Sequence, residues 1–423
     1  MQLKARLYNI LRWSEKYTKT NMVYLAKGGF WLGLGQVVAS ASTFLLAIAF
    51  ANLLPKETYG IYKYLQSTIG LLFIFALSGM STALIPAVAK GYENTLKFAH
   101  KTKFRWALIG SAISLGVALY YLLHNNYTFS LIYGLVSIIF PFWESALIYN
   151  SYLVAKTNFR KSTKFFSIQT ITTSLLLILA SFFWHNFFPL LLIYLASQVF
   201  FSNLFYKKIS AMVPVDAEVD QKVTSYAKHL SVMNILSIIA DRIDGIILFQ
   251  FLGPAQLAIY SFAIAIPEQI KAFIKGVIPL SMPKFSQRPL EEIKKTIWRR
   301  MFYLFLGLLF TVIVYIIFAP LIYKLFFPKY LESIKLSQIF SVSLILAFTA
   351  PIMSILQAHQ KTKELYIINN VGSVILILSI LLGAYFYGLI GAIIGWIFYR
   401  FFLALLLIWR FKSQKSSPTQ DAS

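Results

Sequence analysis

Twelve long apolar runs constrain the fold of this 423-residue chain more than any other feature of its sequence. A helix needs about 20 predominantly apolar residues to cross the hydrocarbon core of a bilayer. The runs lie at residues 28–53, 61–89, 105–123, 129–155, 165–184, 187–206, 229–252, 255–283, 299–319, 336–358, 365–387 and 389–409. We therefore predict an all-α integral membrane protein with about 12 transmembrane helices. Tight turns at Asn186 and Gly388 should separate the two most closely spaced pairs of runs.

The composition excludes an ordinary soluble enzyme and a nucleic-acid-binding domain. Hydrophobic residues make up 58% of the chain and charged residues 13%, whereas soluble domains are about 45–50% apolar and about 25% charged. The chain has no cysteine, and its five histidines are scattered without the i, i+4 spacing of a ligand pair. We therefore expect no disulfide, no metal site and no cofactor. The ATP-binding P-loop sequence is also absent.

The basic residues predict the orientation of the chain in the membrane. Of the 39 Lys and Arg residues, 30 fall in one alternating set of connections and only 4 in the other. Cytoplasmic loops carry such an excess, so both termini are predicted to be cytoplasmic. The net charge of +24 is accordingly a topology signal, and we expect no nucleic-acid partner.

The polar segments and a weak internal echo predict two halves. Nine residues that follow the first run, LPKETYGIY (54–62), resemble nine that follow the seventh, LGPAQLAIY (252–260). Six spans per half would relate the halves by a pseudo-two-fold axis along the membrane normal. The predicted parts are an amphipathic N-terminal segment on the inner leaflet, a first six-helix bundle, a cytoplasmic linker, a second six-helix bundle and a disordered tail, at residues 1–27, 28–206, 207–228, 229–411 and 412–423.

Nine ionisable residues fall at membrane depth and are the candidate functional residues. They are Lys63, Glu144, Asp241, Arg242, Asp244, Glu268, Lys271, Lys275 and Arg400. Each costs about 2.5–3.5 kcal/mol at the centre of a lipid-exposed helix, so we expect most of them to face one another or a hydrated chamber. Helical spacing places Asn234, Ser237, Asp241 and Asp244 on one face, and Glu268, Lys271 and Lys275 on another.

Purely structural roles remain open for several of these residues. Lys63 and Arg400 lie near the ends of their runs and could extend to the lipid headgroups. Arg242 could pair with Asp241 or Asp244, and Glu268 with Lys271. Glu144 follows Pro141 and could be a protonated hydrogen-bonding acid.

Short motifs give the chain a family resemblance. The end of the first span, LPKETYG (54–60), and the later sequence GMSTAL (79–84) resemble the first half of polysaccharide or O-antigen (Wzx-type) flippases. Asp241-Arg242, followed by FLGP (251–254), resembles the opening of the second half of these proteins. The resemblance implies the MATE-like fold of the multidrug/oligosaccharidyl-lipid/polysaccharide exporter superfamily, in which two six-helix bundles surround a cleft.

The resemblance also implies a function in a bacterial cytoplasmic (inner) membrane. A flippase would move a polyprenyl-pyrophosphate-linked oligosaccharide to the outer leaflet by alternating access, alongside a polysaccharide polymerase, glycosyltransferases and membrane lipids. We assign Arg242, Lys271, Lys275, Lys63, Asn234 and Gln36 to substrate binding, and Asp241, Asp244, Glu144 and Glu268 to coupling. The alternatives are a cation-coupled multidrug or toxin exporter and a membrane polysaccharide polymerase or ligase; the short outer loops disfavour an enzyme.

Overall fold

The computed structural model describes residues 22–214, 216–277, 290–359 and 361–414. All regular secondary structure in those ranges is helical. The N-terminal half contains α2 (Met22–Leu53), α3 (Lys56–Leu71), η1 (Leu72–Phe75), α4 (Met80–Ala89), α5 (Thr95–Leu123), α6 (Tyr127–Ala146), α7 (Tyr149–Ala155), α8 (Phe159–Phe183) and α9 (Phe187–Ser210). The C-terminal half contains α10 (Val223–Ala240), α11 (Ile243–Leu252), α12 (Pro254–Val277), α14 (Leu290–Phe326), η3 (Pro328–Tyr330), α15 (Ser333–Ser341), η4 (Val342–Thr349), α16 (Ala350–Ala358) and α17 (Thr362–Ser413).

The lengths and surfaces of these helices are those of a multi-pass membrane protein. In the described ranges, eight helices are long and apolar enough to cross a membrane, or nine if the bent pair α3–η1 and α4 counts as one span. Large apolar side chains lie on the outside, such as Phe310 on α14, which is 70% exposed. Water would oppose such a surface, whereas acyl chains would solvate it. The predicted all-α membrane class is confirmed, while the number of twelve spans and the two-fold axis stay predictions.

The two predicted tight turns are confirmed. Asn186 is the N-cap residue that precedes α9, and its side-chain oxygen accepts a hydrogen bond from the Phe188 backbone N–H at 3.0 Å. Gly388 interrupts α17 with φ 60° and ψ −139°, a conformation that essentially only glycine adopts. On either side of it, Gly383 and Gly391 bring the two helical segments together so closely that a Cβ on either would collide with the backbone of the other. The last two predicted spans therefore form a tight helical hairpin.

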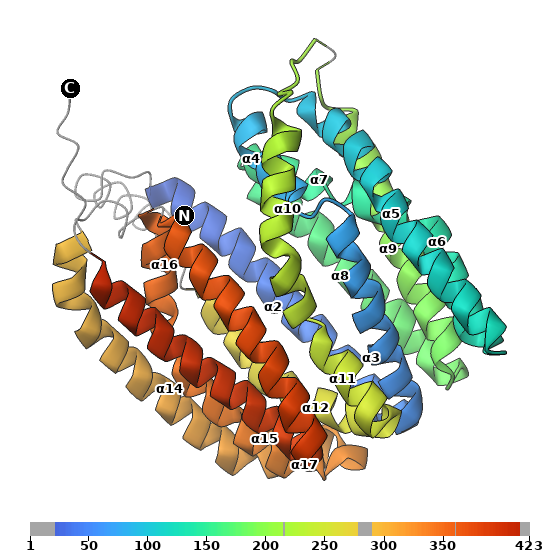
Figure 1. Ribbon diagram of the computed structural model, residues 1–423, viewed down its shortest axis with the longest axis vertical. Helices are drawn as coiled ribbons and strands as arrows, with labels where there is room; N and C mark the ends of the chain where they lie inside the picture. The colour runs from blue at the N-terminus through green and yellow to red at the C-terminus, as the bar shows by residue number, and fades with distance from the viewer. Residues whose placement is uncertain (1–21, 215, 278–289, 360, 415–423) are drawn as a thin grey trace, which may run out of the picture. The chain divides into compact units, whose positions relative to one another are not determined.

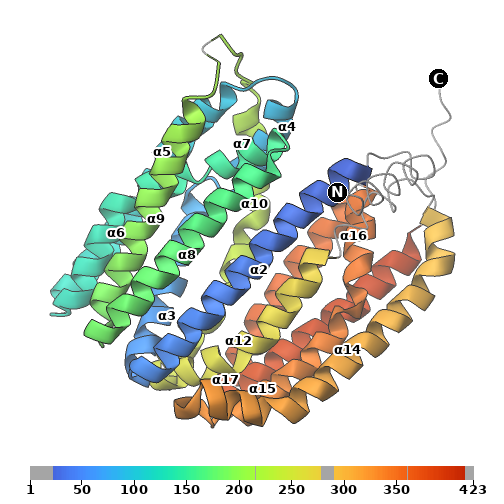
Figure 2. The ribbon, with the colours of Figure 1, turned by 180° about the vertical axis from the view of Figure 1, so that it is seen from behind.

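The described helices pack as two compact units. One comprises the described residues within 37–259, and the other comprises the described residues before 37 together with those after 259. The boundaries fall inside α2 and α12. Within the first unit, α5 lies beside α6 (Figure 1) and α8 beside α9 (Figure 2). Its core includes Met80, Leu84 and Tyr149. In the second unit, α14 and α17 enclose a core that includes Ile297 and Phe411.

Helices α10 and α11 pack with the N-terminal helices, although the sequence assigns them to the second bundle. Small residues allow this close packing. A Cβ on Gly79 would lie 2.5 Å from the Ala227 carbonyl oxygen, and the Gly79 backbone N–H donates a hydrogen bond to Ser231 Oγ at 2.9 Å. The connection between α9 and α10 is also shorter than the predicted linker, because the helices extend to Ser210 and from Val223. The division into bundles stays a prediction about the internal repeat.

The predicted terminal segments fall largely outside the described residues. The amphipathic segment 1–27 is described only from Met22, where α2 begins. The predicted tail, 412–423, is described only to residue 414, and α17 continues into it as far as Ser413.

Candidate functional site

A break between α10 and α11 carries the first group of candidate residues. Sequence periodicity predicts one continuous helix over 229–252, but α10 ends at Ala240 and α11 begins at Ile243. The backbone tightens there, since the Arg242 N–H donates to the Ile239 carbonyl at 3.0 Å, three residues back instead of four. The predicted face that joins Asn234 to Asp244 is therefore interrupted. Broken helices at membrane depth are tolerated where they are buried in protein or line a water-filled space.

Arg242 lies at this break with its side chain exposed. The Cδ and Nε atoms of Arg242 pack against Gly70 of α3, where an added Cβ would lie 2.7 Å from Nε. Within the described ranges, the side chain of Arg242 has no ion pair at 4.0 Å or less. The absence of a side chain at Gly70 therefore makes room for a cation that is accessible from outside the protein.

Lys63 and Asp244 belong to the same charged group. Lys63 on α3 is half-buried, with Nζ 5.6 Å from the centroid of the Tyr59 ring. It lies within electrostatic range of both Arg242 and Asp244. Asp244, in the first turn of α11, accepts a hydrogen bond from the Gly245 N–H at 2.7 Å. Three of the predicted residues, from sequence positions about 180 apart, thus meet at the break.

Neutral hydrogen-bonding and aromatic groups lie on α3 and α11, which pack against each other. The Gln66 amide donates to Tyr62 OH at 3.0 Å, and the Gln250 amide donates to Tyr64 OH at 3.2 Å. The Tyr64 ring stacks on Phe249 with centroids 3.9 Å apart. Amide, hydroxyl and aromatic groups are suited to binding sugar rings, which present both hydroxyls and apolar faces. Sequence analysis placed Gln66 on one face with Lys63, but it did not select Tyr62, Tyr64, Phe249 or Gln250, because their contacts depend on the packing of α3 against α11.

The remaining candidate residues are Asn234, Asp241, Gln36 and Lys275, and they lie on or next to α10, α2 and α12. Asn234 is half-buried, and its backbone carbonyl accepts a hydrogen bond from Ser237 Oγ at 2.9 Å. Asp241 is exposed at the break. Gln36 on α2 is half-buried. Lys275 lies on α12, but its side chain is outside the described residues.

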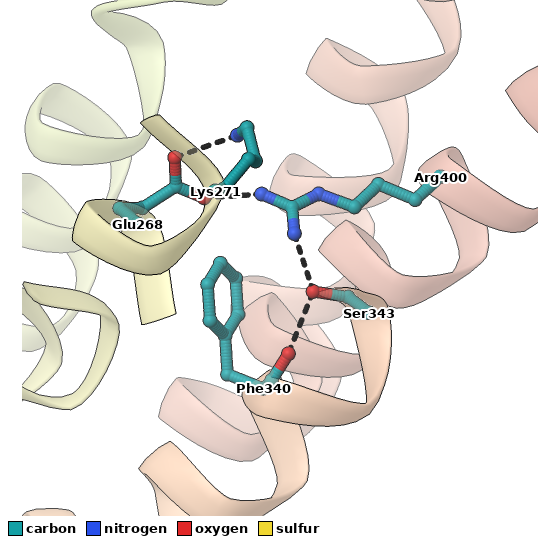
Figure 3. A network of polar contacts seen from close by, with 5 residues as sticks. All are labelled: Glu268, Lys271, Phe340, Ser343 and Arg400. Atoms are coloured by element: carbon teal, nitrogen blue, oxygen red, sulfur yellow. Dashed lines mark hydrogen bonds and ion pairs between the residues drawn. The ribbon is translucent and has the colours of Figure 1, made fainter. Parts of the chain in front are cut away.

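A second charged group forms in the other unit around Glu268 (Figure 3). The Glu268 carboxylate pairs with Lys271 Nζ at 2.6 Å through one oxygen and with Arg400 through the other. Arg400 also donates to Ser343 Oγ at 2.5 Å, and that hydroxyl donates to the Phe340 carbonyl at 2.6 Å. The predicted Glu268–Lys271 pairing is confirmed. The alternative in which Arg400 extends to the headgroups is wrong, because its side chain is only 9% exposed and is bonded inside the protein.

Glu144 belongs to neither group. Its carboxylate pairs with Lys103 Nζ at 2.6 Å, and the two side chains are 8% and 1% exposed. Lys103 precedes the apolar run at 105–123, so the sequence counts it among the basic residues of a predicted connection. That assignment to a loop is wrong, because Lys103 lies inside a helix. Lys103 lies on α5 between the buried residues Ala99 and Ala107, one helical turn away on each side. This i, i+4 spacing of small residues is the signal that could have identified it as buried.

Comparison with known proteins gives the chain a fold and a partial family match. Residues 25–210 match the model of a family described as polysaccharide biosynthesis protein. No curated protein matches the sequence significantly.

Solved structures of two kinds of transporter share the fold. The lipid II flippase MurJ in its inward closed conformation is 14% identical, with a TM-score of 0.63 over 90% of this chain and 87% of that one. An inward-facing MATE-family multidrug transporter of the MOP superfamily is 15% identical, with a TM-score of 0.61 over 89% and 95%. The chain therefore shares the fold of these two structures. The resemblance predicted from its short motifs is thereby confirmed.

Proposed function

We propose that the chain is a flippase that moves a polyprenyl-pyrophosphate-linked oligosaccharide from the inner to the outer leaflet of the bacterial cytoplasmic membrane. The main observation that supports this proposal is the match of residues 25–210 to the polysaccharide biosynthesis family. The fold supports the proposal, because a lipid II flippase and multidrug transporters share it. On this proposal the chain is a transporter and not an enzyme.

The physical task requires a polar route through the membrane. Transferring one hydroxyl from water to hydrocarbon without a hydrogen bond costs about 4–8 kcal/mol, and an ion costs far more. A pyrophosphate that carries several sugars therefore cannot cross unaided. A flippase lowers the barrier by offering hydrogen bonds to the sugar and cations to the pyrophosphate, while the polyprenyl chain stays in lipid.

We assign the pyrophosphate to the cationic residues. Arg242 and Lys63 would bind it at the break in α10–α11, with Asn234 and the amides Gln66 and Gln250 available to sugar hydroxyls. The guanidinium of Arg242 is exposed and has no ion pair among the described residues. These observations support the role, because arginine binds phosphate oxygens through two parallel hydrogen bonds. Gln36, Lys271 and Lys275, which lie in the other unit, are proposed to bind the substrate as well. Access to the binding residues would alternate between the two leaflets.

We assign proton coupling to the acidic residues, and the structure favours Asp241 and Asp244 over Glu144 and Glu268. Asp241 is exposed and Asp244 is half-buried at the break, so both can exchange protons with water that enters there. Glu144 and Glu268 already hold cations, and a proton would have to replace those cations first. Coupling through Asp241 or Asp244 is therefore the simpler route.

The proposed orientation and partners follow from the charge distribution and the substrate. Both termini would be cytoplasmic, given the bias of 30 to 4 in basic residues between alternate connections. Glycosyltransferases on the inner side would supply the lipid-linked oligosaccharide, and a polymerase on the outer side would consume it.

A multidrug exporter is the second candidate, supported by the fold shared with MATE transporters. The two functions differ in the charge that they need. Organic cations require acidic residues and would tolerate loss of Arg242, whereas a pyrophosphate requires the basic ones. Drug-resistance profiles and flipping assays of the same variants separate the two.

The direct test is complementation of a bacterial strain that lacks its polysaccharide flippase. We expect the wild-type chain to restore surface polysaccharide and to remove lipid-linked units that accumulate in the inner leaflet. Arg242→Gln should fail, whereas Arg160→Gln, a control that removes an exposed arginine outside this group, should succeed. Equal complementation by both variants, at equal expression, would remove Arg242 from the mechanism. Failure of the wild-type chain with every carrier-linked glycan would refute the function.

A further inference from the structure

Among the residues that the structure describes, the group around Glu268 contains more positive than negative charge. One carboxylate serves two cations, Lys271 and Arg400. A buried cation is destabilising unless an anion lies beside it. Lys271 and Arg400 share the single negative charge of Glu268, so that charge neutralises neither cation completely. The three side chains come from α12 and α17, and Arg400 is 132 residues from Glu268 in sequence.

Exposure differs within the group in a way that suggests exchange. The Glu268 side chain is 33% exposed, whereas those of Lys271 and Arg400 are 17% and 9% exposed. The anion is therefore the most exposed member of the group, and the two cations are more deeply buried. A carboxylate on a side chain with three rotatable bonds can swing away, while Arg400 is fixed by its hydrogen bond to Ser343.

Aromatic rings hold the two cations in place. The Arg400 guanidinium carbon lies 4.9 Å from the Phe340 ring centroid and 5.3 Å from that of Trp396. Lys271 Nζ lies 5.7 Å from the Trp396 centroid. Cations over aromatic faces are stabilised by the ring quadrupole, so the pair can persist while its anion changes. Among the residues that the structure describes, the buried indole N–H of Trp396 has no hydrogen-bond partner.

We propose that Glu268 is an internal counter-anion that occupies Lys271 and Arg400 in the empty transporter, and that a phosphate group of the substrate displaces it. This inference rests on the proposed function and adds the anion exchange and the role of Arg400. A pyrophosphate carries more charge and more acceptor oxygens than a carboxylate, and it can bind a guanidinium through two hydrogen bonds. It can therefore satisfy both cations at once.

Such an exchange explains why the acidic residue Glu268 lies at the site that we assign to the substrate phosphate. With no substrate present, Glu268 keeps two cations from standing unpaired in a low-dielectric environment. When the substrate leaves, the carboxylate returns and competes with rebinding. A transporter needs binding that is favourable enough for entry and weak enough for release, and a built-in competitor weakens binding at the release step.

The test uses the purified full chain in detergent micelles, titrated with inorganic pyrophosphate. Trp396 is the reporter, because both cations lie over its ring; the chain has eight tryptophans, so the Trp396→Phe protein supplies the background to subtract. Glu268→Gln removes the charge and keeps the shape. The matched control is Glu291→Gln, which removes the acid of another i, i+3 pair, Glu291–Lys294, at the exposed end of α14.

We expect Glu268→Gln to bind pyrophosphate at least about tenfold more tightly than wild type, which corresponds to about 1.4 kcal/mol. Glu291→Gln should bind like wild type. Lys271→Gln leaves a neutral Glu268–Arg400 pair that should fold, and it should bind at least about tenfold more weakly. Unchanged or weaker binding in Glu268→Gln would overturn the proposal, as would wild-type affinity in Lys271→Gln.

Two further arms identify the source of the phosphate. In nanodiscs, undecaprenyl pyrophosphate should change the Trp396 signal, and phosphatidylglycerol should not; an equal response to phosphatidylglycerol would overturn the assignment to the carrier lipid. Complementation separates this inference from the proposed function. If the wild-type chain complements but Glu268→Gln does not tighten binding, only the counter-anion role fails. If Glu268→Gln tightens binding but the wild-type chain does not complement, only the flippase function fails.

Discussion

The buried pair of Lys103 and Glu144 gives the sharpest prediction about stability. Nζ and Oε1 are 2.6 Å apart, and the side chains are 1% and 8% exposed, so neither charge has access to solvent. Removing one partner of such a pair leaves an uncompensated buried charge and costs about 3–5 kcal/mol. Replacing both partners by apolar residues of similar size is often neutral. Lys103→Met alone should therefore destabilise the protein more than Lys103→Met combined with Glu144→Leu.

The assay is thermal unfolding in detergent, followed by the loss of the monodisperse peak in size-exclusion chromatography. About 1 kcal/mol lowers the midpoint by about 2–4 °C in a soluble domain of 150–250 residues. On that scale, Lys103→Met should lower the midpoint by about 6–20 °C, and the double variant should recover most of that loss. Lys101→Met, on the exposed face of α5, is the control and should change little. A single variant as stable as wild type, or a double variant worse than either single one, would refute the reasoning.

Three further predictions concern other positions. Gly70→Leu should abolish flipping at normal expression, because its Cβ would lie 2.7 Å from Arg242 Nε; Gly134→Leu, with nothing within 4 Å of an added Cβ, should remain active. Gly388→Ala should destabilise the protein by about 1–3 kcal/mol, measured by thermal unfolding, because φ there is positive; Gly116→Ala is the helical control, and equal midpoints would contradict this. Glu93 lies between α4 and α5; burial raises its pKa, but hydrogen bonds from Lys156 and Tyr152 outweigh burial and hold its pKa below the ordinary value. Its stabilising contribution is therefore complete above about pH 4.3 and is lost as the pH falls through the lowered pKa. Glu93→Gln should be less stable at neutral pH, and its unfolding midpoint should fall less steeply with acidification than that of wild type. An unchanged dependence of the midpoint on acid pH would contradict the assignment.

The sequence predicts the membrane class and the helical turns well, because these depend on local properties. The length of an apolar run is a direct requirement of the bilayer. Asn186 and Gly388 were recognisable because few residues can begin a helix with a side-chain cap or adopt a positive φ. The pairing of Glu268 with Lys271 was also local, at i, i+3 spacing.

The parts that sequence reasoning missed depend on packing or on distant partners. The break at Asp241–Arg242 leaves the hydropathy of its run unchanged, so a continuous helix was the natural prediction. Lys103 has basic neighbours in sequence and was therefore assigned to a loop, although the helix turns it into the core. Arg400 meets Glu268 across 132 residues, and only the tertiary structure brings these two positions together.

The proposed flippase activity is tested most directly by reconstituting the full chain in proteoliposomes with a fluorescent polyprenyl-pyrophosphate-linked oligosaccharide. The wild-type chain should make substrate from the inner leaflet accessible to a membrane-impermeant quencher, and Arg242→Gln should slow this at least about tenfold. Wild-type liposomes that behave like protein-free ones would contradict the account, provided that the protein is folded and correctly inserted.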